Sequence, residues 1–269
     1  MSLNRALATI GLVRPTRRRG FCPACWRNEP VAPEGVVVQT QIAAPGLVAL
    51  AVLILAAIAW ILQFQQARSM DGMAMGFGSV GSFAASWLVM VAAMMLPSAT
   101  PLAFEFARRS EGRKGWRTAT CLLGVTYLTV WMAFGLACYT IYGALGMPWP
   151  DQGVVGGVVL ALAGPYALTP LKRMGEARCR ELCALHGPQP FNLFRNALVS
   201  GTRYSISCVG CSAALMVALV VIGMSNLVWM TILTGVLLVY KLAPAPGTQG
   251  RLLLSATLVL LGIGYTALG

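Results

Sequence analysis

Residues 46–64 read GLVALAVLILAAIAWILQF, an apolar run that contains no charged side chain. A helix needs about 20 such residues to cross the ~30 Å hydrocarbon core of a bilayer. Similar runs recur along the 269-residue chain, in which 57% of the residues are hydrophobic and only 10% are charged. Ordinary globular domains carry roughly 25% charged residues. The composition therefore predicts an all-α, polytopic membrane helix bundle. It excludes a soluble enzyme, a secreted disulfide scaffold and a DNA-binding domain.

The apolar runs predict about seven transmembrane helices. They cover residues 46–64, 80–104, 119–144, 153–171, 204–224, 227–243 and 251–268. With this division, every Lys and Arg except Arg68 falls in the N-terminal segment or in, or at the edges of, the loops after the second, fourth and sixth spans. Positive charge accumulates in cytoplasmic loops, so the N-terminus is expected inside and the C-terminus outside. We therefore expect a multi-pass protein of a bacterial cytoplasmic membrane, whose net charge of +12 records topology and not a nucleic-acid partner.

Two regions follow from this division: a cytoplasmic basic tail over residues 1–45 and a transmembrane helical domain over residues 46–269. The tail lacks the apolar stretch and the small-residue cleavage site of a signal peptide, so we expect it to be retained. No carboxylate is expected at the middle of the membrane, where proton-driven transporters generally carry one. The chain also has no phosphate-binding loop of the type G-x-x-x-x-G-K-[ST]. Proton-driven and ATP-driven pumping are therefore not favoured.

The first predicted outer loop contains an M-x-x-M-x-M run formed by Met70, Met73 and Met75. Thioethers are soft donors that favour Cu(I), whereas Mg, Ca and Mn prefer oxygen. Exposed methionines at this density are either metal ligands or side chains that dip into lipid at the end of a span. Met also forms no disulfide in an oxidising outer compartment. The run therefore favours a Cu(I) site.

Two of the predicted spans carry further sulfur atoms. In the second span Met90 and Met94 lie on one helix face, followed by Met95. In the fifth span Cys208 and Cys211 form a C-x-x-C pair whose thiols are close enough on a helix to chelate a soft ion, with Met216 further along. The alternative is that these methionines fill the core and that the cysteines are structural.

The remaining chemistry-bearing residues are expected on the cytoplasmic side. The tail holds a C-x-x-C pair, and the predicted loop after the fourth span holds two cysteines and the histidine of the chain: Cys22, Cys25, Cys179, Cys183 and His186. In a reducing cytoplasm such spacing more often indicates metal than disulfide. These residues could form a tetrahedral Zn site, a docking point for Cu(I), or two separate groups.

The methionine run, the W-x-x-M-x-x-A-M-M-x-P-x-x-x-P of residues 87–101 and the C-x-G-C of residues 208–211 resemble a bacterial family of integral membrane proteins. Members of this family are predicted to bind metals, and one of them is a membrane copper chaperone that serves a tyrosinase. The resemblance covers about residues 46–245. It implies copper ligation by the outer methionines, with contributions from the intramembrane sulfur residues: Met70, Met73, Met75, Met90, Met94, Met95, Cys208 and Cys211. The chain departs from the family pattern at Gly78, where a Trp is usual, and at Ser212 and Ala213, where a second Cys and a Trp often follow.

The leading hypothesis is therefore a membrane Cu(I) chaperone that supplies outward-facing copper enzymes, with a copper-enzyme client or a periplasmic copper carrier as partner and the lipid bilayer as surroundings. Two alternatives belong to other classes. The chain could be a structural or assembly subunit of a larger membrane complex, with Met and Cys as packing. It could also be an enzyme that uses copper or a Cys208–Cys211 redox pair. The sequence shows no carboxylate pair, histidine cluster or nucleophile–base set, so enzymatic chemistry is not favoured.

Overall fold

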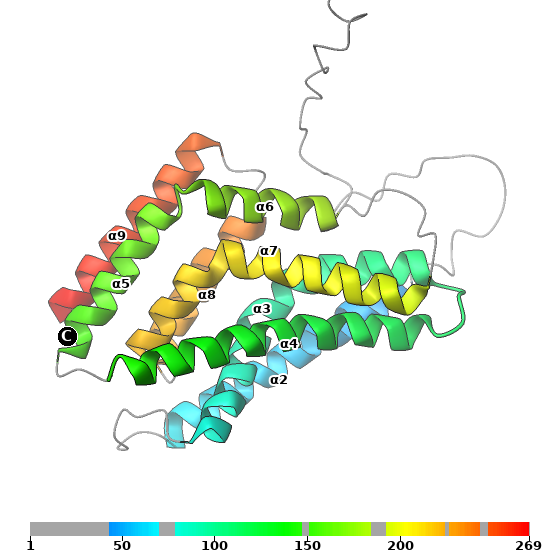
Figure 1. Cartoon of the computed structure of the whole chain (residues 1–269), viewed down its shortest axis with the longest axis horizontal. Coiled ribbons are helices and arrows are strands. Elements are labelled where there is room, and N and C mark those ends of the chain that lie inside the picture. Colours follow the sequence, from blue (N-terminus) through cyan, green and yellow to red (C-terminus); the bar gives the residue numbers. More distant parts are fainter. Residues whose placement is uncertain are drawn as a thin grey trace, which may run out of the picture.

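The computed structural model describes residues 43–69, 79–146, 151–183, 192–223, 226–242 and 247–268. All regular structure in these ranges is helical, which confirms the predicted all-α class. The helices are α2 (Ala43–Ser69), α3 (Val80–Ser110), α4 (Trp116–Ala144), α5 (Gln152–Tyr166), α6 (Pro170–Cys183), α7 (Leu193–Ile222), α8 (Leu227–Leu242) and α9 (Thr248–Leu268). Figure 1 shows α2, α3, α4 and α7 as long rods and the α5–α9 pair at one edge.

Five of the described helices are long and apolar enough to cross a membrane, namely α2, α3, α4, α7 and α9. A sixth span results if α5 and α6, which bend by 70° at a short break, are counted as one broken span. Helix α8 is apolar but shorter. Each of the seven predicted spans corresponds to a helix, whereas the count of seven spans and their orientation stay predictions.

Helix α6 lies where the sequence analysis predicted a loop. Its sequence PLKRMGEARCRELC is too polar to resemble a span, which is why the apolar pattern missed it. The segment is nevertheless rich in Leu, Lys, Arg, Met, Glu and Ala, which favour helices. Pro170 stands at the first helical position, where its missing N–H costs nothing. The placement of Cys179 and Cys183 in a loop was therefore wrong, because both residues lie in α6.

Helix α7 lies at the centre of the bundle. In its most apolar stretch 67% of the residues are buried, against 17% in α2 and in α9. Helix α2 instead exposes a continuous set of large apolar side chains, including Leu47, Leu50 and Ile54. An exposed apolar surface of this size suits contact with lipid and would be a liability in water. The sequence prediction began this span at residue 204, but α7 begins at Leu193, so Arg195 and Arg203 belong to the helix and not to the preceding loop.

A tight turn joins α3 to α4. Gly112 and Gly115 adopt φ values of +80° and +78°, a left-handed conformation that glycine adopts without steric cost. The turn makes α3 and α4 neighbours, and the indole Nε1 of Trp87 on α3 donates a hydrogen bond of 2.8 Å to the carbonyl of Trp131 on α4. Both indole rings are fully buried. This contact fixes the packing of the two helices that lie beside α7.

Candidate metal centre

Two cysteines on α7 form the centre of the candidate site. Cys208 and Cys211 are 0% and 7% exposed, and both lie near the middle of the helix. One helical turn separates them, and the Cys211 thiol donates to the Cys208 carbonyl at 3.2 Å. The spacing therefore places both sulfur atoms on one side of α7, as the C-x-x-C pattern predicted.

Three other helices surround the Cys208 thiol. Tyr127 of α4 places its hydroxyl oxygen 3.4 Å from Cys208 Sγ. Lys241 of α8 places its Nζ 3.1 Å from the same sulfur and donates at 3.1 Å to Ser98 Oγ of α3. Ser98 in turn donates to the Met95 carbonyl at 2.8 Å. The Cys208 sulfur is thus the point at which α3, α4, α7 and α8 are connected by polar contacts.

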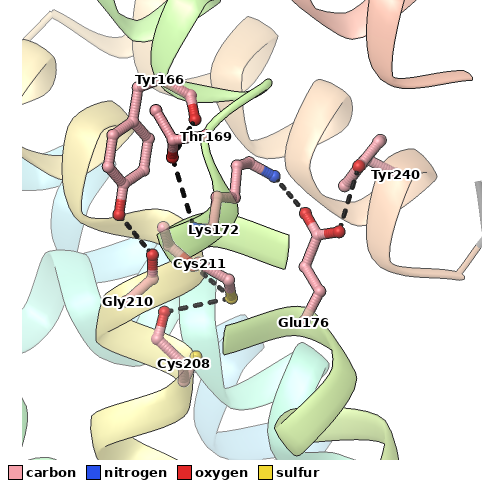
Figure 2. Close-up of polar contacts among 9 residues, drawn as sticks. Tyr166, Thr169, Lys172, Glu176, Cys208, Gly210, Cys211 and Tyr240 are labelled. Atoms are coloured by element: carbon pink, nitrogen blue, oxygen red, sulfur yellow. Dashed lines mark hydrogen bonds and ion pairs between the residues drawn. The ribbon is translucent and has the colours of Figure 1, made fainter. Parts of the chain in front are cut away.

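Helix α6 covers the Cys211 side of the pair. Its Gly175 approaches α7 so closely that a Cβ at this position would lie 3.0 Å from the Ser207 carbonyl oxygen and 3.2 Å from the Cys211 nitrogen. Cys179, also on α6, is partly buried and packs against the core that contains Cys208. At the bend before α6, Tyr166 donates its hydroxyl proton to the Gly210 carbonyl at 2.5 Å, as Figure 2 shows. Helix α6 therefore packs against the Cys211 side of the C-x-x-C pair.

Helix α6 is fastened to α8 by a charged contact. The Lys172 ammonium pairs with the Glu176 carboxylate one turn later on α6. Tyr240 of α8 donates its hydroxyl proton to the other oxygen of Glu176 at 3.3 Å (Figure 2). The Lys172 Nζ also lies 4.2 Å from the centre of the Tyr240 ring, a cation–π contact. Glu176 is therefore fully engaged by partners on α6 and α8.

The methionines of α3 lie at the heart of the bundle. Met90, Met94 and Met95 are all 0% exposed, and Met216 of α7 is equally buried. All four belong to the same buried cluster as Cys208. Three thioethers on α3 and one on α7 thus share the apolar interior with the thiols.

A proline shapes α3 at this level. Pro97 has no N–H, so the Ala93 carbonyl loses its helical partner. The indole Nε1 of Trp60 on α2 donates to this carbonyl at 3.1 Å and satisfies it. The proline therefore leaves the Ala93 carbonyl without its helical donor, and Trp60 of α2 supplies the hydrogen bond instead.

The PpoB2 copper chaperone family matches residues 84–265, which is more than half of the chain. The chain belongs to this family. The match begins after the methionine run of residues 70–75 and includes the helices that contribute Met90, Cys208 and Lys241. No curated protein and no solved structure matches the chain. The family match confirms the resemblance to copper chaperones that the sequence motifs indicated.

The sulfur side chains of the candidate centre are of the type that copper prefers. Thiols and thioethers are soft ligands that select Cu(I), whereas structural Zn sites almost always have four ligands from Cys, His or carboxylates. Among the described residues, no three His, Cys, Asp or Glu side chains are arranged to hold a metal ion. The soft donors that the structure describes here are the two thiols of α7 and the thioethers that share a buried cluster with Cys208.

Several predicted ligands of the copper chaperone lie outside the described residues. These are the outer methionines, the tail cysteines and the histidine: Met70, Met73, Met75, Cys22, Cys25 and His186. The backbone of Cys183 is described, as the last residue of α6, but its side chain is not. Cys179 lies on α6, which packs against α7 through Gly175, and its membership of a cytoplasmic metal group stays a prediction.

Sequence reasoning missed three polar residues of the centre: Ser98, Tyr127 and Lys241. Lys241 was interpreted as a topology marker in the loop after the sixth span, yet it belongs to the last turn of α8 and reaches Cys208. One feature of the sequence could have indicated the contact between Cys208 and Lys241. Cys208 and Lys241 are equally distant in sequence from the short turn between α7 and α8, so an antiparallel helix pair brings them to the same level.

Proposed function

We propose that this copper chaperone binds Cu(I) inside the membrane through Cys208 and Cys211 and transfers it by ligand exchange to outward-facing copper enzymes. The observation that carries the proposal is the buried C-x-x-C pair at the centre of a bundle whose family is named for copper delivery. Thiolates bind Cu(I) more tightly than thioethers, so this pair would be the strong site. The methionines would be the weaker, exchanging ones.

The order of the sulfur residues along the chain supports a transfer route. Helix α3 begins shortly after the outer methionine run and carries Met90, Met94 and Met95 in turn towards the level of Cys208. Ser98, one turn beyond Met95, is linked to Cys208 through the Lys241 ammonium. In the proposed route Met70, Met73 and Met75 capture or present the ion. The buried thioethers of α3, together with Met216, relay it.

The proposed orientation has the N-terminus inside, seven spans and the methionine run outside the cytoplasm. Helix α8 would then be a short span, and α5 would cross while α6 lies across α7. This arrangement rests on the distribution of basic residues and not on the helix count. A second, cytoplasmic site for Zn or Cu(I) would use the four remaining inner residues: Cys22, Cys25, Cys183 and His186.

Copper stoichiometry of the full-length protein, purified under reducing conditions, tests the function. We expect the Cys208→Ser/Cys211→Ser variant to lose about one Cu(I) per chain, because the strong ligands are gone. We expect Met70→Ile/Met73→Ile/Met75→Ile to lose the more weakly held ion. The matched control is Cys121→Ser/Cys138→Ser, which removes two free thiols of α4 outside the centre and should leave the stoichiometry unchanged.

The outcomes separate the two halves of the proposal. If the α7 double variant retains all of its copper, the intramembrane site is wrong and the cysteines are packing residues. If the wild type holds no more Cu(I) than the triple methionine variant, the outer site is wrong, while the inner one stands on its own result.

A further inference from the structure

Lys241 is a cation that contacts a thiol inside the helix bundle. It belongs to the last turn of α8, whose sequence LVWMTILTGVLLVYKL carries no other charge. Its Nζ lies 3.1 Å from Cys208 Sγ and 3.1 Å from Ser98 Oγ. Charged groups in such surroundings are costly, and they are usually paired and functional.

The partner of Lys241 is sulfur and not a carboxylate. In the part of the chain that the structure describes, no ion pair joins Lys241 to an acid. Lys172, which is buried, is paired with Glu176. Glu176 of α6 is engaged by Lys172 and by Tyr240. The charge of Lys241 is therefore directed at the Cys208 sulfur.

The contact between Lys241 and Cys208 affects the total charge of a metal bound at the cysteine pair. When Cu(I) binds two thiols, two S–H bonds break, two Cu–S bonds form and two protons leave to solvent. The product carries one net negative charge. An adjacent ammonium makes the buried assembly neutral, which removes much of the cost of burying an anion. A divalent ion with two thiolates is already neutral, and the same ammonium would then be an uncompensated positive charge.

We propose that Lys241 sets the charge of the Cys208–Cys211 site and thereby selects a monovalent soft ion over a divalent one. Lys241 is a positioning residue and does not ligate the metal. The inference rests on the proposed function, since it requires that the cysteine pair binds Cu(I). It adds the residue that determines which ion the pair accepts.

Metal competition on the full-length protein in detergent tests the proposal, with Cu(I), Ag(I) and Zn(II) each titrated against a chelator of known affinity under reducing conditions. Lys241→Gln should bind Cu(I) and Ag(I) about 10–100-fold more weakly, because a charge within about 4 Å of an ion pair contributes strongly in a poorly hydrated site. Its affinity for Zn(II) should stay the same or rise. Lys241→Arg keeps the charge and should keep the wild-type Cu(I)-to-Zn(II) ratio within about threefold.

The matched control is Arg108→Gln/Glu105→Gln, which removes an ion pair near the end of α3, outside the centre, and should leave the ratio unchanged. Equal losses of Cu(I) and Zn(II) affinity in Lys241→Gln would show a purely structural role and overturn the proposal, as would no loss at all. If Lys241→Gln does not fold, Lys241→Arg decides alone, and a change of ion preference in that variant overturns the proposal.

A different result would show that the proposed function itself is wrong. In that case wild type and Cys208→Ser/Cys211→Ser bind Cu(I) equally, and the inference falls with the site. When the cysteine pair does bind Cu(I), only the ratio measured on the Lys241 variants decides.

Discussion

The α5–α9 pair and the sulfur-lined centre hold helices together in opposite ways. Between α5 and α9 the backbones meet through glycine: a Cβ at Gly262 would lie 2.5 Å from the Ala161 nitrogen, and one at Gly157 would lie 2.6 Å from the Gly262 carbonyl oxygen. At the centre, α3, α4, α7 and α8 are joined by polar side chains that converge on Cys208. Small residues let helices pack closely in lipid without any chemistry. At the centre, polar side chains hold the Cys208 sulfur in place.

The largest effect is expected where the glycine packing is broken. Gly262→Leu places a side chain into the α5 backbone and should lower the free energy of unfolding by about 3 kcal/mol, since overpacking against backbone has no cheap relief. Thermal unfolding in detergent measures it. Gly264→Leu is the matched control, because a Cβ at Gly264 meets nothing within 4 Å. Copper stoichiometry should be unchanged in both variants, and copper loss in Gly262→Leu alone would show that the α5–α9 pair is coupled to the centre.

An intermediate loss of stability is expected at the contact of α3 with α4. A Cβ at Gly135 would lie 2.2 Å from Trp87 Nε1, inside the ring that donates to the Trp131 carbonyl. Gly135→Ala should therefore destabilise the protein by about 2 kcal/mol. Gly124→Ala, on the same helix with open space around it, should instead stabilise by about 0.5–1 kcal/mol because alanine favours helix. Opposite signs in thermal unfolding are the expected result, and equal signs would contradict the close packing of Trp87.

The smallest effect on stability is expected at the centre itself. Tyr127→Phe removes the hydroxyl that lies 3.4 Å from Cys208 Sγ and should cost about 0.5–1 kcal/mol of unfolding free energy. The same variant should lose about fivefold in Cu(I) affinity, because a hydrogen bond to a thiolate sulfur is lost. Chelator competition checks it, and Tyr139→Phe on the same helix is the control. An unchanged Cu(I) affinity in Tyr127→Phe would mean that this hydroxyl is a packing group like those of the α5–α9 pair.

The expected positions of the helices depended on local information and were largely confirmed. Residues 46–64 predict a helix because an apolar run of this length needs its backbone hydrogen bonds inside the segment, and α2 occupies this region. The same reasoning failed for α6, because its polar residues do not form an apolar run. It also failed for the start of α7, because the charged Arg195 is typical of a loop between spans.

The site was predictable only in its sulfur atoms. The C-x-x-C spacing by itself placed Cys208 and Cys211 on one side of a helix, and the Met90–Met94 spacing did the same for α3. The sequence, through apolarity, charge distribution and soft donors, thus predicted a helical membrane protein that binds copper, and the helical class and the copper chaperone family are confirmed. Tertiary structure decided what surrounds the sulfur: Lys241 is 33 residues from Cys208 and Tyr127 is 81 residues away. Contacts across such separations depend on how helices cross, and helix crossing is set by shape and packing that no local pattern encodes.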